Sequence, residues 1–338
     1  MRAVICLEPG RLALVEREPP ASVPPGWARV AVSHVGICGT DYHIFQGKHP
    51  FLEYPRIMGH EISGTVVEPG ESGLAAGMTV VVNPYISCGT CIACRKDKPN
   101  CCTAIRVLGV HTDGAFCEEI VVPGENLYPA DGLSPEAAAM VEFLAIGAHA
   151  VRRSLMPEGS RALVIGAGPI GLGTALFSRI AGHVVTMMDA SAERLAMADT
   201  RFGFRDGLLA GASAAADVAR VTEGEGFDVV FDATGHAGSM EGAFAHVAHG
   251  GTLVLVSVVK DDIRFSDPEF HKREMMLVGS RNALRVDFDH VMASMRAGRV
   301  PVEALVTHRT TLERAPEDLA RWATQKSGLI KAIVHVAA

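Results

Sequence analysis

Two kinds of hydrophobic pattern follow one another along the chain. Up to about residue 150, short apolar runs alternate with turns that contain Gly and Pro, a pattern typical of an all-β domain. Ser134, followed by Pro135 and Glu136, then predicts the start of a helix, because Ser caps helices and Pro favours their first turn. The strands predicted in this part are residues 27–32, 64–67, 78–83 and 119–122.

From Ser160 onward, apolar strands alternate with helices. Strands that are apolar throughout and separated by helices indicate a parallel sheet covered on both faces. A weaker strand at 206–210 completes a six-stranded doubly wound order. The other predicted strands are 161–165, 183–189, 227–235, 252–258 and 276–280, with helices after the Gly-rich turn, around 193–198 and at 239–249.

The alternation stops near Arg296, and the strand-like segment 329–336 follows. We therefore predict an α/β protein with a β-rich domain formed by residues 1–152 and 296–338. A doubly wound domain, residues 153–295, is inserted into it. The segments 253–258 and 276–280 give that sheet an apolar edge, which predicts pairing with a second copy of the chain.

Composition narrows the classes of function. The 338 residues carry a formal charge of −7, from 31 Lys and Arg against 38 Asp and Glu. With no basic run, nucleic acid and anionic membranes are unfavourable partners. No apolar stretch approaches the roughly 20 residues of a membrane-spanning helix, and the chain opens with MRAVICLE rather than a leader. We expect a cytoplasmic protein.

Five of the eight cysteines lie close together in the sequence. Cys88, Cys91, Cys94 and Cys102 form the pattern C-x2-C-x2-C-x7-C, and four thiolates complete the tetrahedral shell of a structural zinc ion. An iron–sulfur cluster is the alternative, whereas disulfides belong to short secreted chains. Cys101 competes with Cys102 as the fourth ligand, and we favour Cys102.

A Gly-rich turn directly follows the strand 161–165. It reads GAGPIG, and its candidate cofactor-binding residues are Gly166, Gly168, Pro169, Ile170 and Gly171. A strand before and a helix after such a turn are typical of a dinucleotide site, in which the pyrophosphate lies at the helix N-terminus.

Asp189 ends the next strand, 18 residues after Gly171. A carboxylate there accepts a hydrogen bond from the ribose 2′-hydroxyl of NAD and repels the 2′-phosphate of NADP. Arg194, one helical turn further on, is placed to stack over the adenine. The alternative is that Asp189 only caps the helix beginning at Ser191. We predict NAD as the cofactor.

Two further segments, VGICGTDYH at 35–43 and PRIMGHE at 55–61, complete the set of motifs. In order along the whole chain, these motifs resemble the zinc-containing medium-chain dehydrogenase/reductase superfamily, which includes alcohol, sorbitol and threonine dehydrogenases. The resemblance implies a GroES-like catalytic domain, a Rossmann domain, two zinc ions per chain, NAD, and a homodimer or homotetramer.

The resemblance also implies ligands of a catalytic zinc. Cys38 and His60 match the first two ligands, and Glu142 matches the third ligand of the sorbitol and threonine dehydrogenase branch. Glu61 matches the acidic neighbour that can move onto the metal. Phe143 stands where that branch usually has Pro. Three protein ligands leave the fourth position open for water or substrate.

Thr40 and His43 match the proton relay of the same family. The implied mechanism begins with a substrate hydroxyl whose pKa the zinc lowers. The proton leaves through Thr40, the nicotinamide ribose and His43, while the carbon-bound hydrogen passes as a hydride to the nicotinamide.

The sequences of two segments suggest the class of substrate. HPFLEYPR at 49–56 and VLGVHTDG at 107–114 resemble bacterial enzymes that oxidise sugar acids such as L-gulonate or L-galactonate. A carboxylate on the substrate needs a cation, and Lys48, Arg106, His111 and Arg281 are the candidates. A neutral polyol and L-threonine are the alternative substrates.

Two other classes of protein compete with this interpretation. A zinc-ribbon binding module explains the cysteine cluster but leaves Cys38, His60, Glu142 and the GAGPIG turn without a role. A zinc-free reductase that uses NADPH has no use for Cys38 and His60. The metal content separates the three classes, because they require two zinc ions, one and none.

Overall fold

A computed structural model describes residues 1–48, 52–325 and 327–336 of the chain. The chain forms two compact units, the first made of Met1–Glu142, Met292–Gly298 and the part from Leu305 onward, and the second of Phe143–Val291 and Arg299–Ala304. The division proposed from the sequence, at 152/153 and 295/296, remains a prediction.

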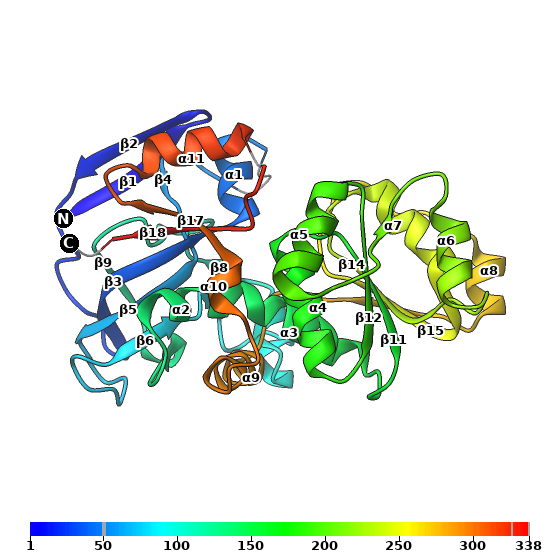
Figure 1. Cartoon of the computed structure of the whole chain (residues 1–338). Coiled ribbons are helices and arrows are strands. Elements are labelled where there is room, and N and C mark those ends of the chain that lie inside the picture. The colour runs from blue at the N-terminus through cyan, green and yellow to red at the C-terminus, as the bar shows by residue number, and fades with distance from the viewer. Residues whose placement is uncertain (49–51, 326, 337–338) are drawn as a thin grey trace. The chain divides into compact units, whose positions relative to one another are not determined.

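The main sheet of the first unit joins strands from both ends of the chain. Strand β18 (Lys331–His335) pairs antiparallel with β3 (Trp27–Ile37), with Val334 opposite Val35, so the C-terminal segment returns to the first unit (Figure 1). The remaining strands beside β3 and β18 are β10 (Leu127–Pro129), β6 (Thr79–Val82), β5 (Glu61–Glu68), β17 (Val306–Thr311) and β9 (Glu119–Pro123).

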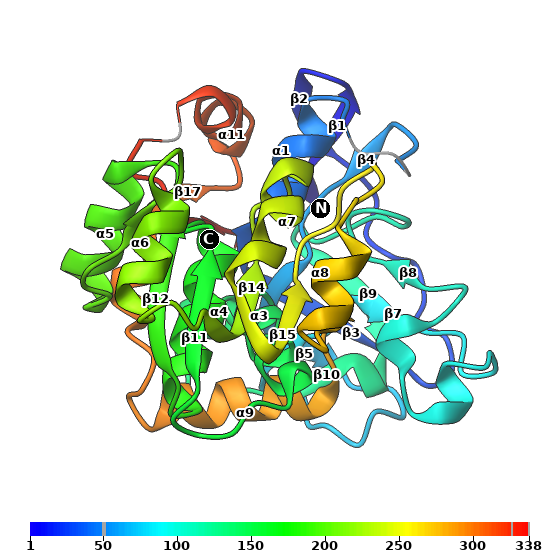
Figure 2. The ribbon, with the colours of Figure 1, turned by 90° about the vertical axis from the view of Figure 1, so that its right-hand side faces the viewer.

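Two small sheets accompany it. One contains β1 (Arg2–Glu8), β2 (Arg11–Glu16) and β4 (Arg56–Ile57). The other pairs β7 (Tyr85–Ile86) with β8 (Arg106–Val107), in the cyan part of Figure 2. Apolar side chains from these strands and from helix α11 (Ala315–Thr324) form one core, in which Val35, Ile62, Phe116 and Trp322 are buried.

Helices interrupt this β-rich unit. Helix α2 (Pro135–Ala139) begins where the sequence predicts, and the Ser134 hydroxyl accepts a hydrogen bond from the Ala137 N–H. Helix α1 (Gly39–Phe45) lies inside the segment predicted as all-β, so that prediction is wrong there. The reason is local, because Cys38 and Asp41 form a reciprocal cap at the N-terminus of α1.

The second unit contains the parallel sheet predicted from the sequence. Its strands, in spatial order, are β13 (Leu208–Leu209), β12 (Val184–Asp189), β11 (Arg161–Ile165), β14 (Phe227–Asp232), β15 (Val247–Leu255) and β16 (Met276–Gly279). Every pairing in this order is parallel. Strand β12, the first strand after the Gly-rich turn and its helix, lies beside β11. This arrangement is typical of the doubly wound topology.

Helices cover both faces of this sheet. Figure 1 shows α4 (Pro169–Ile180) and α5 (Ala192–Phe202) on one face, and α6 (Ala214–Val221) and α7 (Ala237–Ala243) on the other. No helix in the described residues has the length and apolarity needed to cross a membrane. The remaining helices are α3 (Val141–Ser154), α8 (Asp267–Lys272), α9 (Arg285–Arg296) and α10 (Val302–Leu305).

The helix predicted at 239–249 is too long. Helix α7 ends at Ala243, a short 3-10 turn follows, and β15 already begins at Val247. The sequence predicts a helix up to residue 249 and a strand from residue 252, but the strand passes through Gly250 and Gly251 with a shift in its pairing to β14. Gly250 supplies the positive φ of 76° that this irregularity requires.

Candidate metal and cofactor sites

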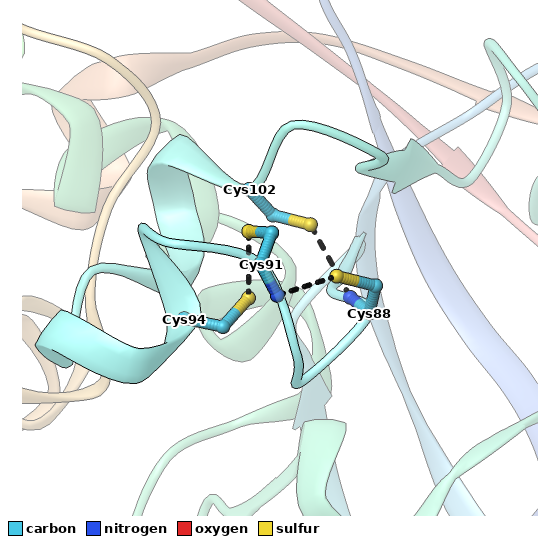
Figure 3. Close-up of side chains that lie close together, drawn as sticks. All are labelled: Cys88, Cys91, Cys94 and Cys102. Atoms are coloured by element: carbon cyan, nitrogen blue, oxygen red, sulfur yellow. Dashed lines mark hydrogen bonds between the residues drawn. The ribbon is translucent and has the colours of Figure 1, made fainter.

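The cysteine cluster lies in the loop between β7 and β8. Figure 3 shows the side chains of Cys88, Cys91, Cys94 and Cys102 turned toward one another, and their sulfur atoms all lie within 4.8 Å of one another. The Cys91 and Cys94 sulfurs are 3.5 Å apart. Cys102 is buried and belongs to this group, whereas its neighbour Cys101 is exposed.

These thiols fit a single zinc ion. Tetrahedral zinc with Zn–S bonds of about 2.3 Å separates its sulfur ligands by about 3.8 Å, which matches the observed spacing, whereas a cluster of several irons would hold the thiolates further apart. Backbone N–H groups lower the pKa of Cys91 to about 5 and that of Cys88 to about 7, whereas desolvation raises the pKa of Cys94 to about 11. A lowered pKa favours the thiolate, which is the form that binds metal.

A second group of metal-binding side chains forms around Cys38. Its sulfur, a ring nitrogen of His60 and a carboxylate oxygen of Glu61 lie within 4.8 Å of one another. His60 is 6% exposed, and its Nδ1 has no hydrogen-bond partner among the described residues. A thiol, an imidazole and a carboxylate that lie this close together fit a zinc ion, for which these are the usual ligand types.

Asp41 connects the two loops that carry this group. Its carboxylate accepts hydrogen bonds from the Cys38 N–H at 2.8 Å and the Gly59 N–H at 3.2 Å. Burial raises the pKa of Asp41, and the neighbouring His60 opposes that rise. Asp41 therefore fixes the backbone on either side of the candidate site, at Cys38 and directly before His60.

The two glutamates near Cys38 have different partners. Both oxygens of Glu61 accept hydrogen bonds from the Lys331 ammonium group, at 2.7 and 2.8 Å. Glu142 accepts a hydrogen bond from the Tyr85 hydroxyl, and burial raises its pKa to about 7. Glu142 is not among the side chains within 4.8 Å of Cys38 and His60 in the described residues, although its charge, like those of Cys38 and Asp41, raises the pKa of His60 against the effect of burial.

The two residues expected in the proton relay lie on α1. The Thr40 hydroxyl oxygen is 3.8 Å from the Cys38 sulfur, and His43 lies one turn further along on the exposed part of the helix. Residues three positions apart on a helix share a face. Thr40 is thus beside the candidate metal group, and His43 connects the same helix face with solvent.

The Gly-rich turn joins β11 to α4 in the second unit. Gly166 has a φ of 103°, and Gly168 is the N-cap of α4. A Cβ atom at Gly171 would lie 1.6 Å from the Gly166 carbonyl oxygen, so Gly171 is required by packing. A Cβ atom at Gly168 would meet nothing closer than Arg194, at 4.0 Å. The space beside Gly168 is therefore open, as a phosphate-binding turn requires.

Asp189 also holds this turn in place. One carboxylate oxygen accepts a hydrogen bond from the Ala167 N–H at 2.6 Å, and the other accepts one from the Ser191 N–H at 2.8 Å. The Ser191 hydroxyl, and not Asp189, caps α5. Arg194 lies 4.0 Å from the carboxylate. A carboxylate has about four acceptor positions, so two backbone contacts leave capacity for a ribose hydroxyl.

The candidate cations for a substrate carboxylate are scattered. Arg106 lines a hollow of about 550 Å³ together with Trp27, Ser87 and Glu125. Among the described residues that border this hollow, none is a candidate ligand of the catalytic metal. The role of Arg106 in substrate binding remains a prediction.

The other three candidates lie elsewhere. Lys48 is exposed just after α1, and its N–H donates to the carbonyl of His43. His111 accepts a hydrogen bond from the Val107 N–H, and Arg281 belongs to the second unit. Residues 49–51 of the HPFLEYPR segment lie outside the described residues.

Three residues of the site were missed in the sequence. Asp41 carries a signal, because Cys38-x-x-Asp41 has the spacing of a helix cap. Lys331 carries one as well, since a lone charge in the apolar strand KAIVHV indicates a buried partner. Tyr85 carries none, because its hydroxyl meets Glu142 only through the tertiary fold.

Two family models and several known proteins match this chain. Residues 24–132 match the alcohol dehydrogenase GroES-like domain, and residues 169–297 match the zinc-binding dehydrogenase domain. The L-galactonate-5-dehydrogenase of Escherichia coli strain K12 is 40% identical to this chain, and the alignment covers 99% of this chain and 98% of that enzyme. The D-altritol 5-dehydrogenase of Agrobacterium fabrum strain C58 is 35% identical to this chain, and the alignment covers 92% of this chain and 93% of that enzyme.

Solved structures of dehydrogenases also superimpose on this chain. An alcohol dehydrogenase from Escherichia coli CFT073 in complex with NADH superimposes with a TM-score of 0.91, at 28% identity and 99% coverage of both chains. A zinc-binding dehydrogenase from Sinorhizobium meliloti 1021 bound to NADP gives a TM-score of 0.88, at 28% identity, covering 99% of this chain and 98% of the other. The chain thus belongs to the zinc-binding alcohol dehydrogenases, a family of NAD(P)-dependent oxidoreductases with a GroES-like and a Rossmann domain.

Proposed function

We propose that this enzyme uses zinc and NAD to oxidise a secondary hydroxyl of a sugar acid of the L-galactonate or L-gulonate type to a ketone. The observation that carries the proposal is the group formed by Cys38, His60 and Glu61, with the buried Glu142 as an electrostatic neighbour of His60, in a chain 40% identical to an L-galactonate-5-dehydrogenase. Free thiols suited to zinc fit a reducing compartment, and we infer a cytoplasmic enzyme.

Different residues of the first unit have different roles in this reaction. Cys38, His60 and Glu142 would hold the catalytic zinc, with Glu61 beside it. Zinc in that position would lower the pKa of the substrate hydroxyl, and NAD would accept the hydride. Thr40 receives the hydroxyl proton, since its oxygen lies beside the Cys38 sulfur. His43, on the exposed part of the same helix, releases that proton to solvent.

The first prediction concerns the metal content. We expect two zinc ions per chain in the unmodified protein and one in either Cys38→Ser or Cys94→Ser, because each removes a ligand of one site. Cys101→Ser is the matched control and keeps both ions, since Cys101 is exposed beside the cluster. Elemental analysis of the purified variants measures this. Retention of both ions in Cys38→Ser would exclude the catalytic site.

A second prediction concerns the cofactor turn. Gly168→Ala keeps the fold, since its Cβ meets nothing within 4 Å except the tip of Arg194. It fills the space that the pyrophosphate needs, and we expect NADH binding at least about tenfold weaker. Gly171→Ala loses thermal stability instead, because its Cβ overlaps the Gly166 carbonyl. Fluorescence titration and thermal unfolding separate the two effects, and unchanged NADH affinity in Gly168→Ala contradicts the assignment.

The proposed partner is a second copy of the chain. Strand β16 ends the order of the parallel sheet, and Met276 and Leu277 on it are 51% and 39% exposed. Apolar edge strands of this kind favour pairing across a two-fold axis. We expect a homodimer or homotetramer in sedimentation velocity, and Leu277→Lys should shift it toward smaller species. A monomeric unmodified protein would refute this proposal.

The substrate is tested through its carboxylate. We propose that Lys48, three residues after the end of α1 at Phe45, pairs with this carboxylate. Lys48→Met should then raise KM for the sugar acid by about 10- to 100-fold, the equivalent of a charge-assisted contact of about 1.5–3 kcal/mol. A neutral polyol should be unaffected. Arg106→Met tests the second candidate cation in the same way, and we expect a smaller effect, because Arg106 lines a hollow that includes none of the candidate metal ligands.

The measurement is a screen of aldonic acids, polyols and L-threonine with NAD and with NADP. We expect an aldonic acid with NAD to give the highest kcat/KM. A polyol is the second candidate, because one relative acts on D-altritol. A polyol or L-threonine that exceeds every aldonic acid would remove the sugar-acid proposal, and equal use of NADP would show that Asp189 does not select the cofactor.

A further inference from the structure

A hollow of about 390 Å³, which we call the His34 hollow, lies within the first unit. None of the described residues that line it is a candidate metal ligand or part of the Gly-rich turn. The proposed reaction gives this hollow no role. Its charged and titratable side chains come from five elements, namely His34 on β3, Glu136 on α2, Arg309 on β17, Arg314 at the N-cap of α11 and His335 on β18.

Two arginines bring positive charge to the His34 hollow. Two N–H groups of Arg309 donate to the oxygens of Glu136, at 2.7 and 2.8 Å. Arg314 has a looser contact, because its Nε lies 3.8 Å from a carboxylate oxygen of Asp318 and its side chain is 68% exposed. Asp318 already accepts a hydrogen bond from Arg321 at 2.6 Å. Arg314 is therefore the cation best placed to bind an anion here.

Two histidines lie side by side in the same hollow. His34 and His335 are opposite one another in the pairing of β3 with β18, and their ring centroids are 4.7 Å apart. Burial lowers the pKa of His34, the neighbouring His335 and Arg309 lower it further, and Glu136 opposes them. Glu313 is a further charged group that interacts with His335. An anion beside the two rings would favour their protonated forms.

The chemistry of the His34 hollow favours an anion over a metal ion. His34, His335 and Glu136 are of the types that bind metals, but in the described part of the chain their ligand atoms do not form a group within 4.8 Å of one another. The two arginines would also repel a cation. Guanidinium and imidazolium groups are instead the donors that bind carboxylates and phosphates.

Among anions, a phosphate group fits these side chains better than a carboxylate does. Arg309 already has a carboxylate partner in Glu136, so a ligand with a single negative charge gains little by replacing it. A phosphate monoester carries a charge of about −1.5 to −2 at pH 7 and three strong acceptor oxygens. The volume of about 390 Å³ lies in the range of roughly 300–1,000 Å³ typical of small-molecule sites, so it also accommodates a small organic group.

We propose that the His34 hollow is a second ligand site of this chain and binds a phosphate group, either free or carried by a small sugar ester. Arg314 makes the main contact and Arg309 supports it. His34 and His335 add donors, and they add positive charge as the pH falls. The site shares no residue with the metal and cofactor sites, so the proposal stands independently of the proposed reaction.

The test is calorimetric titration of the full-length protein saturated with NADH, so that the Gly-rich turn is occupied. The probes are glycerol 3-phosphate, inorganic phosphate, glycerate and glycerol. We expect glycerol 3-phosphate to bind at least about tenfold more tightly than glycerate, and glycerol not to bind. Tighter binding of the ester than of inorganic phosphate assigns the site to an ester, and equal binding assigns it to free phosphate. Absence of binding by both phosphates, or equally tight binding of glycerate, overturns the proposal.

Arg314→Met locates the bound phosphate. The side chain is mostly exposed, so the variant keeps the fold, and we expect its affinity for glycerol 3-phosphate to fall at least about tenfold. Arg11→Met is the matched control, because Arg11 is 65% exposed in the same unit and also has a carboxylate neighbour, Glu8. It should leave the affinity unchanged. Full affinity in Arg314→Met would place the ligand at another site, and an equal loss in both variants would reduce the effect to net charge; either result refutes the proposal.

The pH dependence tests the two histidines, with sulfate as the probe. Unlike phosphate, sulfate keeps its charge between about pH 6 and pH 8. Imidazoles take up protons as the pH falls, and a bound anion favours their charged form, so sulfate should bind at least about threefold more tightly at pH 6 than at pH 8. His335→Gln should lose this increase, whereas His271→Gln, at an exposed position on α8, should keep it. An increase that persists in His335→Gln would exclude the histidine pair from the site.

Discussion

The buried ion pair between Glu61 and Lys331 ties the first unit together at its candidate metal site. Glu61 begins β5, Lys331 begins β18, and the carbonyl of Ile37, the last residue of β3, completes the contacts of the ammonium group. These strands are neighbours in one sheet, although Glu61 and Lys331 are 270 positions apart in the sequence. The C-terminal segment therefore does more than complete the sheet, because it neutralises a carboxylate beside Cys38.

This contact also requires that the C-terminal segment returns to the first unit. A buried Lys without its counter-ion is strongly destabilising, so the sheet reaches its stable form only when β18 has returned to β3. Asp41 makes a similar connection between segments that are closer in the sequence, because its carboxylate accepts hydrogen bonds from the backbone N–H groups of Cys38 and Gly59. Two buried polar contacts, one long-range and one local, thus hold the residues that approach a metal.

The features predicted correctly from the sequence are those with a local physical cause. The apolar strands 161–165, 183–189 and 227–235 coincide with strands of the parallel sheet, because the burial of such strands is visible in their composition. The weak strand at 206–210 also coincides with a strand, β13, although Leu209 in it is exposed. The cysteine spacing brought the four thiols together for a similar reason. Helix α1 was missed because its cap uses Cys38 rather than Ser or Thr.

Features that arise from tertiary contact could not be predicted from the sequence. The extent of β15 is one of them, since Gly250 and Gly251 usually end an element, and only the pairing with β14 carries the strand through them. The same applies to the partners of the two glutamates, because Lys331 and Tyr85 meet Glu61 and Glu142 only through the tertiary fold.

Asp189 shows how a residue expected to have one role acquires another in the fold. Its carboxylate accepts from the N–H of Ala167, inside the Gly-rich turn, as well as from Ser191. The Asp189 carboxylate, expected to bind the ribose, therefore also fixes the turn expected to bind the pyrophosphate. Replacing it to admit a 2′-phosphate would remove the repulsive charge and, at the same time, release the Ala167 N–H. A change of cofactor preference in this chain consequently requires a new acceptor for that N–H, in addition to a cation for the phosphate.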